Sequence, residues 1–440
     1  MSPSISFLKG KVNFLAVLAV IATTVFSWYN QNSWCIIFLV LCRLVDGGPV
    51  KAIRSAFTNR YFLAFLALVL VDTIGLAYTH NFGEGERIVE KEATLVAIAF
   101  ALCGGVFADG SDYRRLMTGY CGILVVACIY CLVKAGQHYR SMTEKDISVF
   151  FYHKLSGAIG QNAVFFTVFM LFGLLFLLYH PLETGALPAR FRKALQLFLI
   201  LFFIGIIVLL SSKLLLIVLF LLLVYYVLER YISRRNFIAI TLIGIGGLMV
   251  TMWIFFSDNP VKRRYQDLEH GGIDMNQTTF SDSTVFNGAQ IRLLQWRYAK
   301  QIMTEHNAWI FGVTGGDSQT LLNEKYAKAH MFMGRAHTKQ RGFTDYNFHN
   351  QYIETTVRSG FLGLAVLLYL CWLMIALVSE RRTAETAFTA LTLLSICAVE
   401  SILTLQHGVF AFAFMPIVLL YSPKSQPREK KVSRPAPETA

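Results

Sequence analysis

The chain has 440 residues, of which 55% are hydrophobic and only 15% are charged, and its mean hydropathy is +0.51. A water-soluble protein of this length needs a larger charged surface, so the composition excludes an ordinary soluble globular protein. The formal net charge is +13, but many Lys and Arg residues occupy short loops between apolar runs and do not form one basic groove. This distribution is typical of a membrane protein, and nucleic acid is not an expected partner.

Apolar stretches long enough to cross a bilayer, about 20 residues each, recur along the whole chain. We therefore predict an all-α, polytopic integral membrane protein with about 12 transmembrane helices. The first apolar run follows Lys9 and Lys11 but lacks a small-residue cleavage site, so we interpret it as a span and not as a signal peptide. The predicted spans lie near residues 12–28, 33–48, 61–78, 92–108, 116–133, 161–180, 194–210, 214–228, 237–256, 360–378, 386–403 and 408–422.

Clusters of basic residues follow every second predicted span and therefore fall on one side of the membrane. Because Lys and Arg are enriched in cytoplasmic loops, we assign this side, which also holds the N-terminus, to the cytoplasm. An even number of spans then places both termini inside and the long loop after the ninth span outside. The clusters comprise Lys51, Arg54, Arg60, Arg114, Arg115, Arg190, Arg192, Lys193, Arg230, Arg234, Arg235, Arg381, Arg382 and the basic residues of the tail.

One apolar run, from Ala194 to Leu228, is too long for a single span and is interrupted only at Ser211, Ser212 and Lys213. Basic clusters at both of its ends require a hairpin, which places Lys213 at the outer surface. An equally acceptable interpretation of Lys213 is a lysine that snorkels from a helix end.

The long polar loop divides the chain into four parts. The loop contains no cysteine, so no disulfide is expected to hold it. The parts are residues 1–256 with the first nine spans, 257–359 as a loop that faces the periplasm, 360–422 with the last three spans, and 423–440 as a basic cytoplasmic tail.

Two helices are expected inside the loop. Apolar residues at helical spacing predict one helix from about Gly288 to His306. Asp317 or Ser318 could cap a second helix that runs to about His330. We therefore expect a small helical cap, and not an independent domain, over the membrane helices.

Four short stretches carry a resemblance to a known family. His349-Asn350 is followed by nine residues and then by Gly360-x-x-Gly363. Upstream stand Arg292-x-x-x-Trp296 and a glycine-containing stretch, Ile310 to Asp317, and downstream stands a stretch from Glu400 to Phe410. In this order around one outer loop, the motifs resemble the bacterial O-antigen ligases, whose superfamily also includes O-antigen polymerases. The resemblance extends from about Arg264 to Phe410 and is only topological before that.

The resemblance implies a fold, a reaction and partners. It implies transfer of a glycan from undecaprenyl pyrophosphate to lipid A–core in lipopolysaccharide biosynthesis. The reaction would occur on the periplasmic side of a Gram-negative inner membrane, among membrane lipid, without a nucleotide sugar, cofactor or metal. In agreement, the loop has no Asp-x-Asp pair, which a metal-dependent nucleotide-sugar transferase would commonly need.

His349 is the predicted general base. A sugar hydroxyl that attacks an anomeric carbon must lose its proton, and a neutral imidazole suits that task near pH 7. His349 precedes a predicted helix, whose N-terminus disfavours the imidazolium and keeps the ring available as a base. The alternative is a loop histidine that caps the helix or bonds locally.

The pyrophosphate leaving group needs fixed cations near it. We expect Arg292 to bind it, with Arg264 second and Lys213 third, because arginine can bind phosphate oxygens in bidentate fashion. The family often has arginine where this chain has Lys213. The alternative for Arg292 is the polar face of an amphipathic helix.

Four more residues could support the site. Tyr352 and Trp296 could stack on sugar rings, although aromatic packing in a core is the commoner role. Asn350 and His407 enter through the family motifs.

Three functions remain open from the sequence. The first is a metal-independent ligase that displaces the pyrophosphate directly and therefore inverts the anomeric carbon. The second is an O-antigen polymerase, which uses the same donor with a second lipid-linked glycan as acceptor. The third is a polysaccharide transporter, which the twelve predicted spans would fit but which should show repeated halves and charged or broken helices at the membrane midplane.

Overall fold

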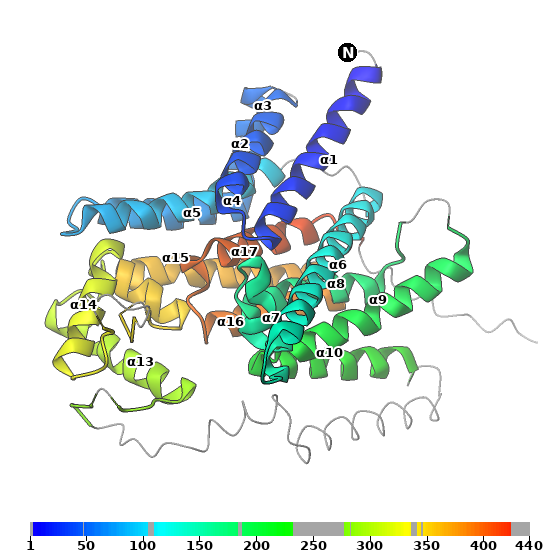
Figure 1. Cartoon of the computed structure of the whole chain (residues 1–440). Helices are drawn as coiled ribbons and strands as arrows, with labels where there is room; N and C mark the ends of the chain where they lie inside the picture. The colour runs from blue at the N-terminus through cyan, green and yellow to red at the C-terminus, as the bar shows by residue number, and fades with distance from the viewer. Residues whose placement is uncertain are drawn as a thin grey trace, which may run out of the picture.

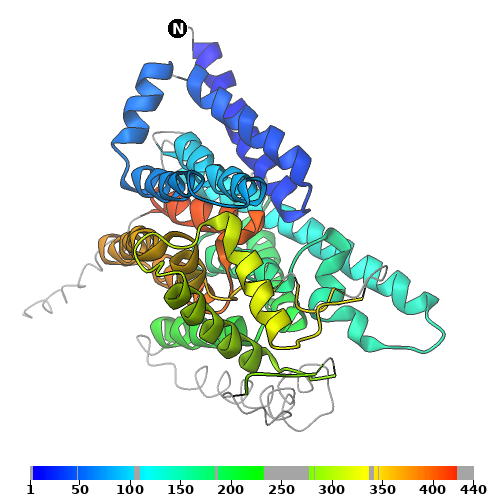
Figure 2. The same cartoon turned by 90° about the vertical axis from the view of Figure 1, so that its left-hand side faces the viewer.

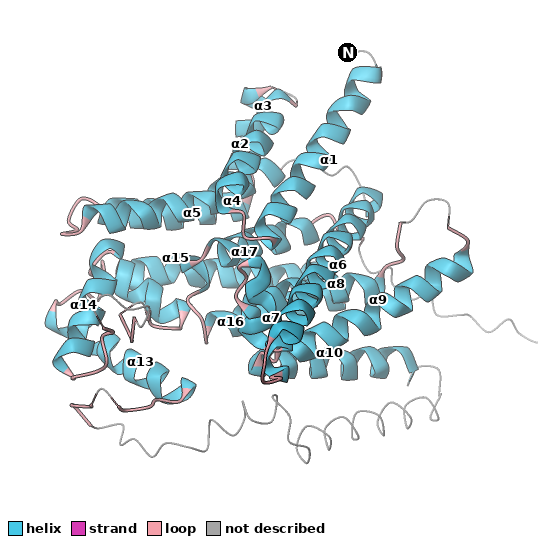
Figure 3. Cartoon of the chain, viewed as in Figure 1, coloured by secondary structure: helices cyan, strands magenta, loops and turns pink. Residues whose placement is uncertain are grey.

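A computed structural model describes residues 3–46, 48–103, 110–183, 187–231, 277–281, 283–335, 341–344 and 346–423 (Figure 1). Within these ranges the chain forms helices and loops and no strand, which confirms the all-α prediction (Figure 3). The predicted ninth span, Arg264 and the basic tail lie outside the described residues.

The first ten helices are α1 (Pro3–Val25), α2 (Tyr29–Val45), α3 (Pro49–Phe57), α4 (Arg60–Gly75), α5 (Phe82–Leu102), α6 (Gly110–Ser141), α7 (Tyr152–Ser156), α8 (Ala163–Tyr179), α9 (Ala189–Leu210) and α10 (Lys213–Tyr231).

The remaining helices contain the predicted site motifs and the last spans. They are α13 (Gly288–Glu305), α14 (Gly315–Lys328), α15 (Gln351–Arg381), α16 (Ala384–Cys397) and α17 (Gln406–Leu419), with short 3-10 turns at Ile147–Phe150, Gly157–Ile159 and Ile402–Thr404. In Figure 1, α13 and α14 gather at one end of the molecule, beside the first turns of α5 and α15. Figure 2, seen from that end, shows them in front of the membrane helices.

Among the described residues, the structure contains fewer candidate membrane spans than the sequence predicts. Three helices are long and apolar enough to cross a membrane, and the count rises to five if two bent helix pairs are each one span. The pairs α3–α4 and α7–α8 bend by 84° and 79°. Other predicted spans form helices of 14–17 residues, which reach only about 21–26 Å against a hydrocarbon thickness of about 30 Å. The prediction of about 12 transmembrane helices is therefore not confirmed.

The apolar run between residues 194 and 228 forms the predicted hairpin. Helix α9 ends at Leu210, and Ser211 adopts a left-handed conformation with φ of 49°. The Ser211 N–H donates to the carbonyls of Ile207 and Val208, which closes the helix end. Lys213 then opens α10 and is partly buried.

The first loop helix matches its prediction closely. Asn287 caps α13, and its side chain and that of Gln290 form a capping box. The apolar stripe, including Ile291, Leu294 and Ile302, is buried against α14 and the segment before α15. The two loop helices thus share a small apolar core, distinct from the large core among the membrane helices.

The second loop helix begins earlier than predicted. Helix α14 starts at Gly315 and not after Asp317. The Asp317 carboxylate instead accepts the backbone N–H groups of His80 and Asn81, each at 3.0 Å, and so joins α14 to the turn before α5. Burial opposes ionisation of Asp317, but these hydrogen bonds outweigh burial and lower the pKa of the carboxyl below its ordinary value.

Two motif glycines allow the α13–α14 loop to lie directly on the backbone of α15. Helix α15 is broken at Gly360, whose φ of 62° and ψ of −162° are essentially restricted to glycine. A Cβ on Gly360 would lie 2.2 Å from the Ile310 carbonyl oxygen, and a Cβ on Gly312 would lie 2.3 Å from the Arg358 carbonyl oxygen. Any side chain at either position would force the two segments apart.

Backbone hydrogen bonds hold the two segments where the glycines let them meet. The N–H groups of Val313 and Thr314 donate to Val357 and Arg358 at 2.8 and 2.9 Å, and that of Phe361 donates to Trp309 at 2.8 Å. The break in α15 exposes these backbone groups, and the loop forms hydrogen bonds with them.

A buried ion pair fixes the same region of α15 to the membrane helices. Arg358 contacts Glu92 of α5 at 3.2 Å, and both side chains are 2% exposed. The next residue, Ser359, donates from its hydroxyl to Asp72 of α4. Removal of one partner of a buried pair leaves an uncompensated charge and typically costs about 3–5 kcal/mol.

The contact at Gly360 yields a stability prediction. We expect Gly360→Ala to lower the free energy of unfolding by at least about 2 kcal/mol, because alanine is strained in this conformation and its Cβ meets the Ile310 carbonyl. The measurement is the midpoint of thermal unfolding in detergent. Gly205→Ala on α9, where a Cβ meets open space, is the matched control. Equal midpoints for the two variants would contradict this account.

Candidate active site

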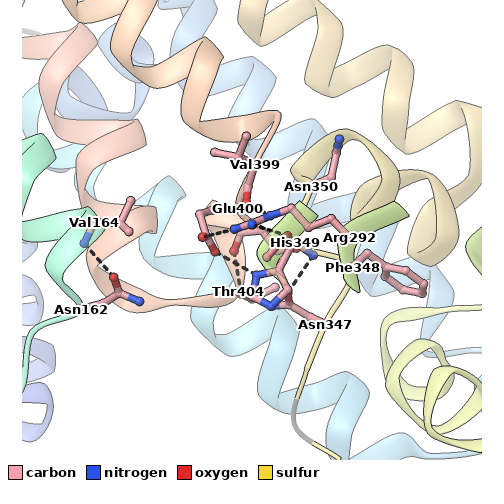
Figure 4. A network of polar contacts seen from close by, with 12 residues as sticks. Asn162, Val164, Arg292, Asn347, Phe348, His349, Asn350, Val399, Glu400 and Thr404 are labelled. Carbon is pink, nitrogen blue, oxygen red and sulfur yellow. Dashed lines mark hydrogen bonds and ion pairs between the residues drawn. The ribbon is translucent and has the colours of Figure 1, made fainter. Parts of the chain in front are cut away.

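Three segments distant in sequence converge around one carboxylate (Figure 4). The first is the segment before α15, which carries His349; the second is the start of α13, which carries Arg292; the third is the connection between α16 and α17, which carries Glu400. Figure 4 shows the His349 and Arg292 side chains meeting at Glu400. The predicted base and the predicted phosphate-binding residue therefore share one partner.

Glu400 orients the imidazole of His349. Its Oε2 lies 3.1 Å from Nδ1. In the neutral tautomer that donates Nδ1–H to this carboxylate, Nε2 is the acceptor nitrogen. The His349 side chain is 25% exposed, so it is held by the protein but still accessible. A carboxylate behind an imidazole fixes its tautomer and stabilises the imidazolium that forms when Nε2 accepts a proton.

The backbone at His349 is strained, and neighbouring groups hold it. His349 has a φ of +46°, a left-handed conformation that is uncommon for a residue other than glycine. Its N–H donates to Oδ1 of Asn347 at 3.0 Å, and Asn347 in turn donates to Thr404 of the α16–α17 connection at 3.3 Å. Trp296 of α13 donates its indole N–H to the Phe348 carbonyl at 3.1 Å.

Asn350 and Tyr352 fasten the start of α15 to α16. Asn350 is the N-cap of α15: its Oδ1 accepts the Ile353 N–H, and its Nδ2 donates to the Ala398 carbonyl at 3.1 Å. The Tyr352 hydroxyl donates to the Leu394 carbonyl at 3.2 Å. In this structure Asn350, Tyr352 and Trp296 use their polar groups to position the segment that carries His349.

Arg292 is held by three acceptors and keeps two donors. Its Nε donates to the Val399 carbonyl at 3.1 Å, Nη1 to the Gly288 carbonyl at 2.8 Å, and Nη2 to Oε1 of Glu400 at 3.0 Å. A guanidinium has five N–H donors, so two remain for an anionic ligand. The side chain is 28% exposed, which leaves those donors within reach of a ligand.

The electrostatics of this cluster imply a need for more cations. Glu400 cancels the charge of Arg292, so with a neutral His349 the three side chains carry no net charge. A pyrophosphate would need additional positive charge close by. Arg264 lies outside the described residues, and none of the contacts described for His349, Glu400 and Arg292 involves Lys213. Both residues remain predictions for this role.

His407 lies near the cluster but faces another direction. It is 3% exposed, and its ring packs between those of Tyr29 and Phe165, with centroids 5.7 and 5.5 Å away. Its Nδ1 lies 3.5 Å from the Tyr29 hydroxyl. His407 therefore contacts the start of α2, and the described contacts of the His349 imidazole do not include it.

Sequence reasoning gave no role to Glu400. It is separated from His349 by 51 residues and from Arg292 by 108, so no local pattern connects them. One signal was present: Glu400 is the one Asp, Glu, Lys or Arg between residues 386 and 422. A lone carboxylate between two apolar runs indicates a partner supplied by the tertiary structure.

The comparison with protein families agrees with the motifs. Residues 197–368 match the family model described as O-antigen ligase. The match covers α9, α10, α13, α14 and the first part of α15, and so includes Arg292 and His349 but not Glu400. A search among curated proteins finds no match.

This family indicates a multi-pass membrane enzyme of glycosyltransferase type, with an O-antigen ligase or polymerase function that acts on a lipid-linked glycan and a lipid acceptor. The matched residues include Arg292 of α13 and His349 before α15, whose roles in catalysis remain predictions. The match over residues 197–368 therefore supports an O-antigen ligase family protein.

Proposed function

We propose that the protein is an O-antigen ligase, which transfers a glycan from undecaprenyl pyrophosphate to lipid A–core without a metal or other cofactor. The observation that carries the proposal is the single carboxylate of Glu400, which orients His349 at 3.1 Å and Arg292 at 3.0 Å. The proposed general base and the proposed phosphate-binding guanidinium thus contact the same carboxylate, which supports a direct displacement of pyrophosphate.

In the proposed reaction, a hydroxyl of the acceptor core sugar gives its proton to Nε2 of His349. The hydroxyl oxygen bonds to the anomeric carbon of the donor while the bond from that carbon to the pyrophosphate oxygen breaks. The electron pair of the broken bond stays on undecaprenyl pyrophosphate, and the imidazolium returns its proton to water. A single displacement inverts the anomeric carbon.

Arg292 would bind the leaving group through its two remaining N–H donors, where charge develops as the bond breaks. Because Glu400 neutralises Arg292, we propose that Arg264 and Lys213 supply the further positive charge. We place the protein in the inner membrane of a Gram-negative bacterium, with the His349 cluster on the periplasmic side, since the basic clusters lie at the opposite ends of the spans.

His349→Gln tests the general base. We expect the transfer rate to fall about 10²- to 10⁴-fold, the usual contribution of a positioned acid–base group, while the thermal midpoint stays close to that of the wild type. The assay is transfer between defined donor and acceptor glycolipids in liposomes. His306→Gln, at an exposed histidine that ends α13, is the matched control. Full activity of His349→Gln would remove the residue from the proposed role.

Glu400→Gln tests the shared carboxylate. Glutamine keeps an acceptor for the imidazole but loses the charge that holds Arg292, so we expect a lower kcat together with a higher KM for the donor. His349→Gln should lower kcat alone, because it leaves the Arg292–Glu400 contact in place. Steady-state kinetics with varied donor separates these two patterns. An unchanged donor KM in Glu400→Gln would show that the link to Arg292 is unimportant for binding.

A deletion strain separates ligase from polymerase. If the protein is a ligase, a strain without it should accumulate long glycan chains on undecaprenyl pyrophosphate and make lipid A–core without O-antigen. Loss of a polymerase would instead yield core that carries one repeat unit. Gel analysis of lipopolysaccharide and of the lipid-linked glycans distinguishes the two results, and complementation with His349→Gln provides the inactive control.

A further inference from the structure

A cavity lies at the same end of the membrane helices as the candidate active site. It has a volume of about 410 Å³ and is lined by residues of three separate segments: Phe26 to Tyr29 between α1 and α2, Tyr130 of α6, and Ala158 to Gly160 before α8. Lys9 and Lys11 lie at the end of α1 away from this cavity, and Arg381 lies at the end of α15 away from His349, whereas Lys134 and Arg140 of α6 lie at the cavity end. The cavity and the His349 cluster therefore face the same side of the membrane.

Aromatic rings line much of this cavity, and Nζ of Lys134 lies 5.6 Å from the ring centroid of Tyr130. The side chains of Trp28, Tyr29 and Tyr130 are 53%, 43% and 43% exposed. Phe26 packs between two of them, with ring centroids 5.2 Å from Trp28 and 6.4 Å from Tyr130. The rings thus offer flat apolar faces together with two phenol hydroxyls and an indole N–H, an arrangement that suits a ligand with both apolar and hydroxyl-bearing faces.

The floor of the cavity is preorganised. Ser27 and Gly160 both adopt left-handed conformations, with φ of 54° and 70°, and a Cβ on Gly160 would lie 3.2 Å from that of Ser27. Gln161, which is 3% exposed, donates to the carbonyls of Thr24 and Val25 at 2.7 and 3.1 Å and so closes the end of α1. The buried hydrogen bonds of Gln161 therefore hold this loop, and with it the shape of the cavity, in place.

Contacts connect the cavity to the candidate active site. Asn347, two residues before His349, contacts Thr404, and His407 contacts Tyr29 in the cavity wall. Thr404 and His407 are three residues apart, a span of at most about 10 Å. Gln406 adds a hydrogen bond of 2.6 Å to Asn32 of α2. In Figure 4, Asn162, two residues beyond Gly160, lies across the α16–α17 connection from the His349 cluster.

We infer that this cavity binds sugar rings of a glycolipid substrate, stacked on Trp28 and Tyr130, while the reacting sugar lies at His349. The inference rests on the proposed ligase function. Sugar rings present apolar C–H faces and a rim of hydroxyls, which match aromatic faces bordered by polar groups. The volume falls within the range of about 300–1,000 Å³ that is usual for small-ligand sites. The sugars belong either to the donor glycan or to the acceptor core.

A lipid-facing role is the competing explanation, because Trp and Tyr are enriched where membrane helices meet the headgroups. Aromatic residues of that kind stand on the outer surface of a helix and need no strained loop to hold them. Trp34 of α2 is an example at 72% exposure, outside the cavity. The convergence of rings from three segments on one cavity favours a sugar ligand.

The test compares Trp28→Ala and Tyr130→Ala with Trp34→Ala in liposomes that contain the full-length protein. Donors of increasing glycan length are titrated at saturating acceptor, and acceptors with full or truncated core are titrated at saturating donor. We expect Trp28→Ala and Tyr130→Ala to raise one KM about tenfold, equivalent to 1.4 kcal/mol, with kcat little changed. Trp28→Phe, which keeps a ring, should restore most of the affinity. An effect on the donor KM that grows with glycan length assigns the cavity to the donor; an effect on the acceptor KM assigns it to the core.

Direct binding separates this inference from the proposed reaction. Calorimetry of the purified protein with soluble oligosaccharide, released by mild acid from lipopolysaccharide of the source strain, should show binding that Trp28→Ala weakens and Trp34→Ala does not. If the wild type binds the oligosaccharide in this way but transfers no glycan, the cavity stands and the ligase proposal falls. If the wild type transfers glycan while Trp28→Ala changes neither KM nor binding, the cavity is not a sugar site. Equal effects of Trp28→Ala and Trp34→Ala, independent of glycan length, would identify a contact with membrane lipid and overturn the inference.

Discussion

The close backbone contact between the segments at Gly312 and Gly360 determines where the loop helices lie. Helix α15 breaks at Gly360, and the α13–α14 loop fills the break with backbone hydrogen bonds. Because α15 is also tied to α5 through the buried Arg358–Glu92 pair, the loop inherits the position of the membrane helices. The contact between the α13–α14 loop and α15 thus helps to position Arg292 on α13 relative to His349 before α15.

A single carboxylate then organises the chemistry. Glu400 orients the imidazole and the guanidinium together, so any movement of the α16–α17 connection would displace both groups at once. The same carboxylate cancels the charge of Arg292. Precise orientation is therefore obtained at the expense of attraction for an anion, and the proposed function must draw its remaining positive charge from other residues. The sequence indicated only one electrostatic influence on His349, the N-terminus of the following helix. The Glu400 carboxylate is a second influence, which the tertiary structure supplies.

Local patterns predicted local structure well. The capped, amphipathic α13 and the break between α9 and α10 follow from residues within a few positions of one another, and both appear as expected. The position of His349 directly before a helix was predictable for the same reason. Local reasoning failed for α14, since Asp317 could have been a cap but instead bonds to the turn at His80, 237 residues away.

Long-range features were beyond the sequence pattern. Hydropathy measures how apolar a segment is but gives no information about bends. The prediction therefore missed the bends of about 80° within the α3–α4 and α7–α8 pairs. Glu400 joined the site only through tertiary contacts. Trp296 and Tyr352 were expected to stack on sugars, yet both use their polar atoms to bond backbone carbonyls. Exposed rings that could serve that purpose came from α1–α2 and α6, segments with no motif to connect them.

The left-handed backbone at His349 has a consequence for the history of this position. Glycine or asparagine would adopt a φ of +46° at lower cost than histidine. Selection for a stable fold alone would therefore favour another residue at this position. Directed evolution of this protein toward heat resistance, without an activity screen, should replace this histidine, the proposed general base.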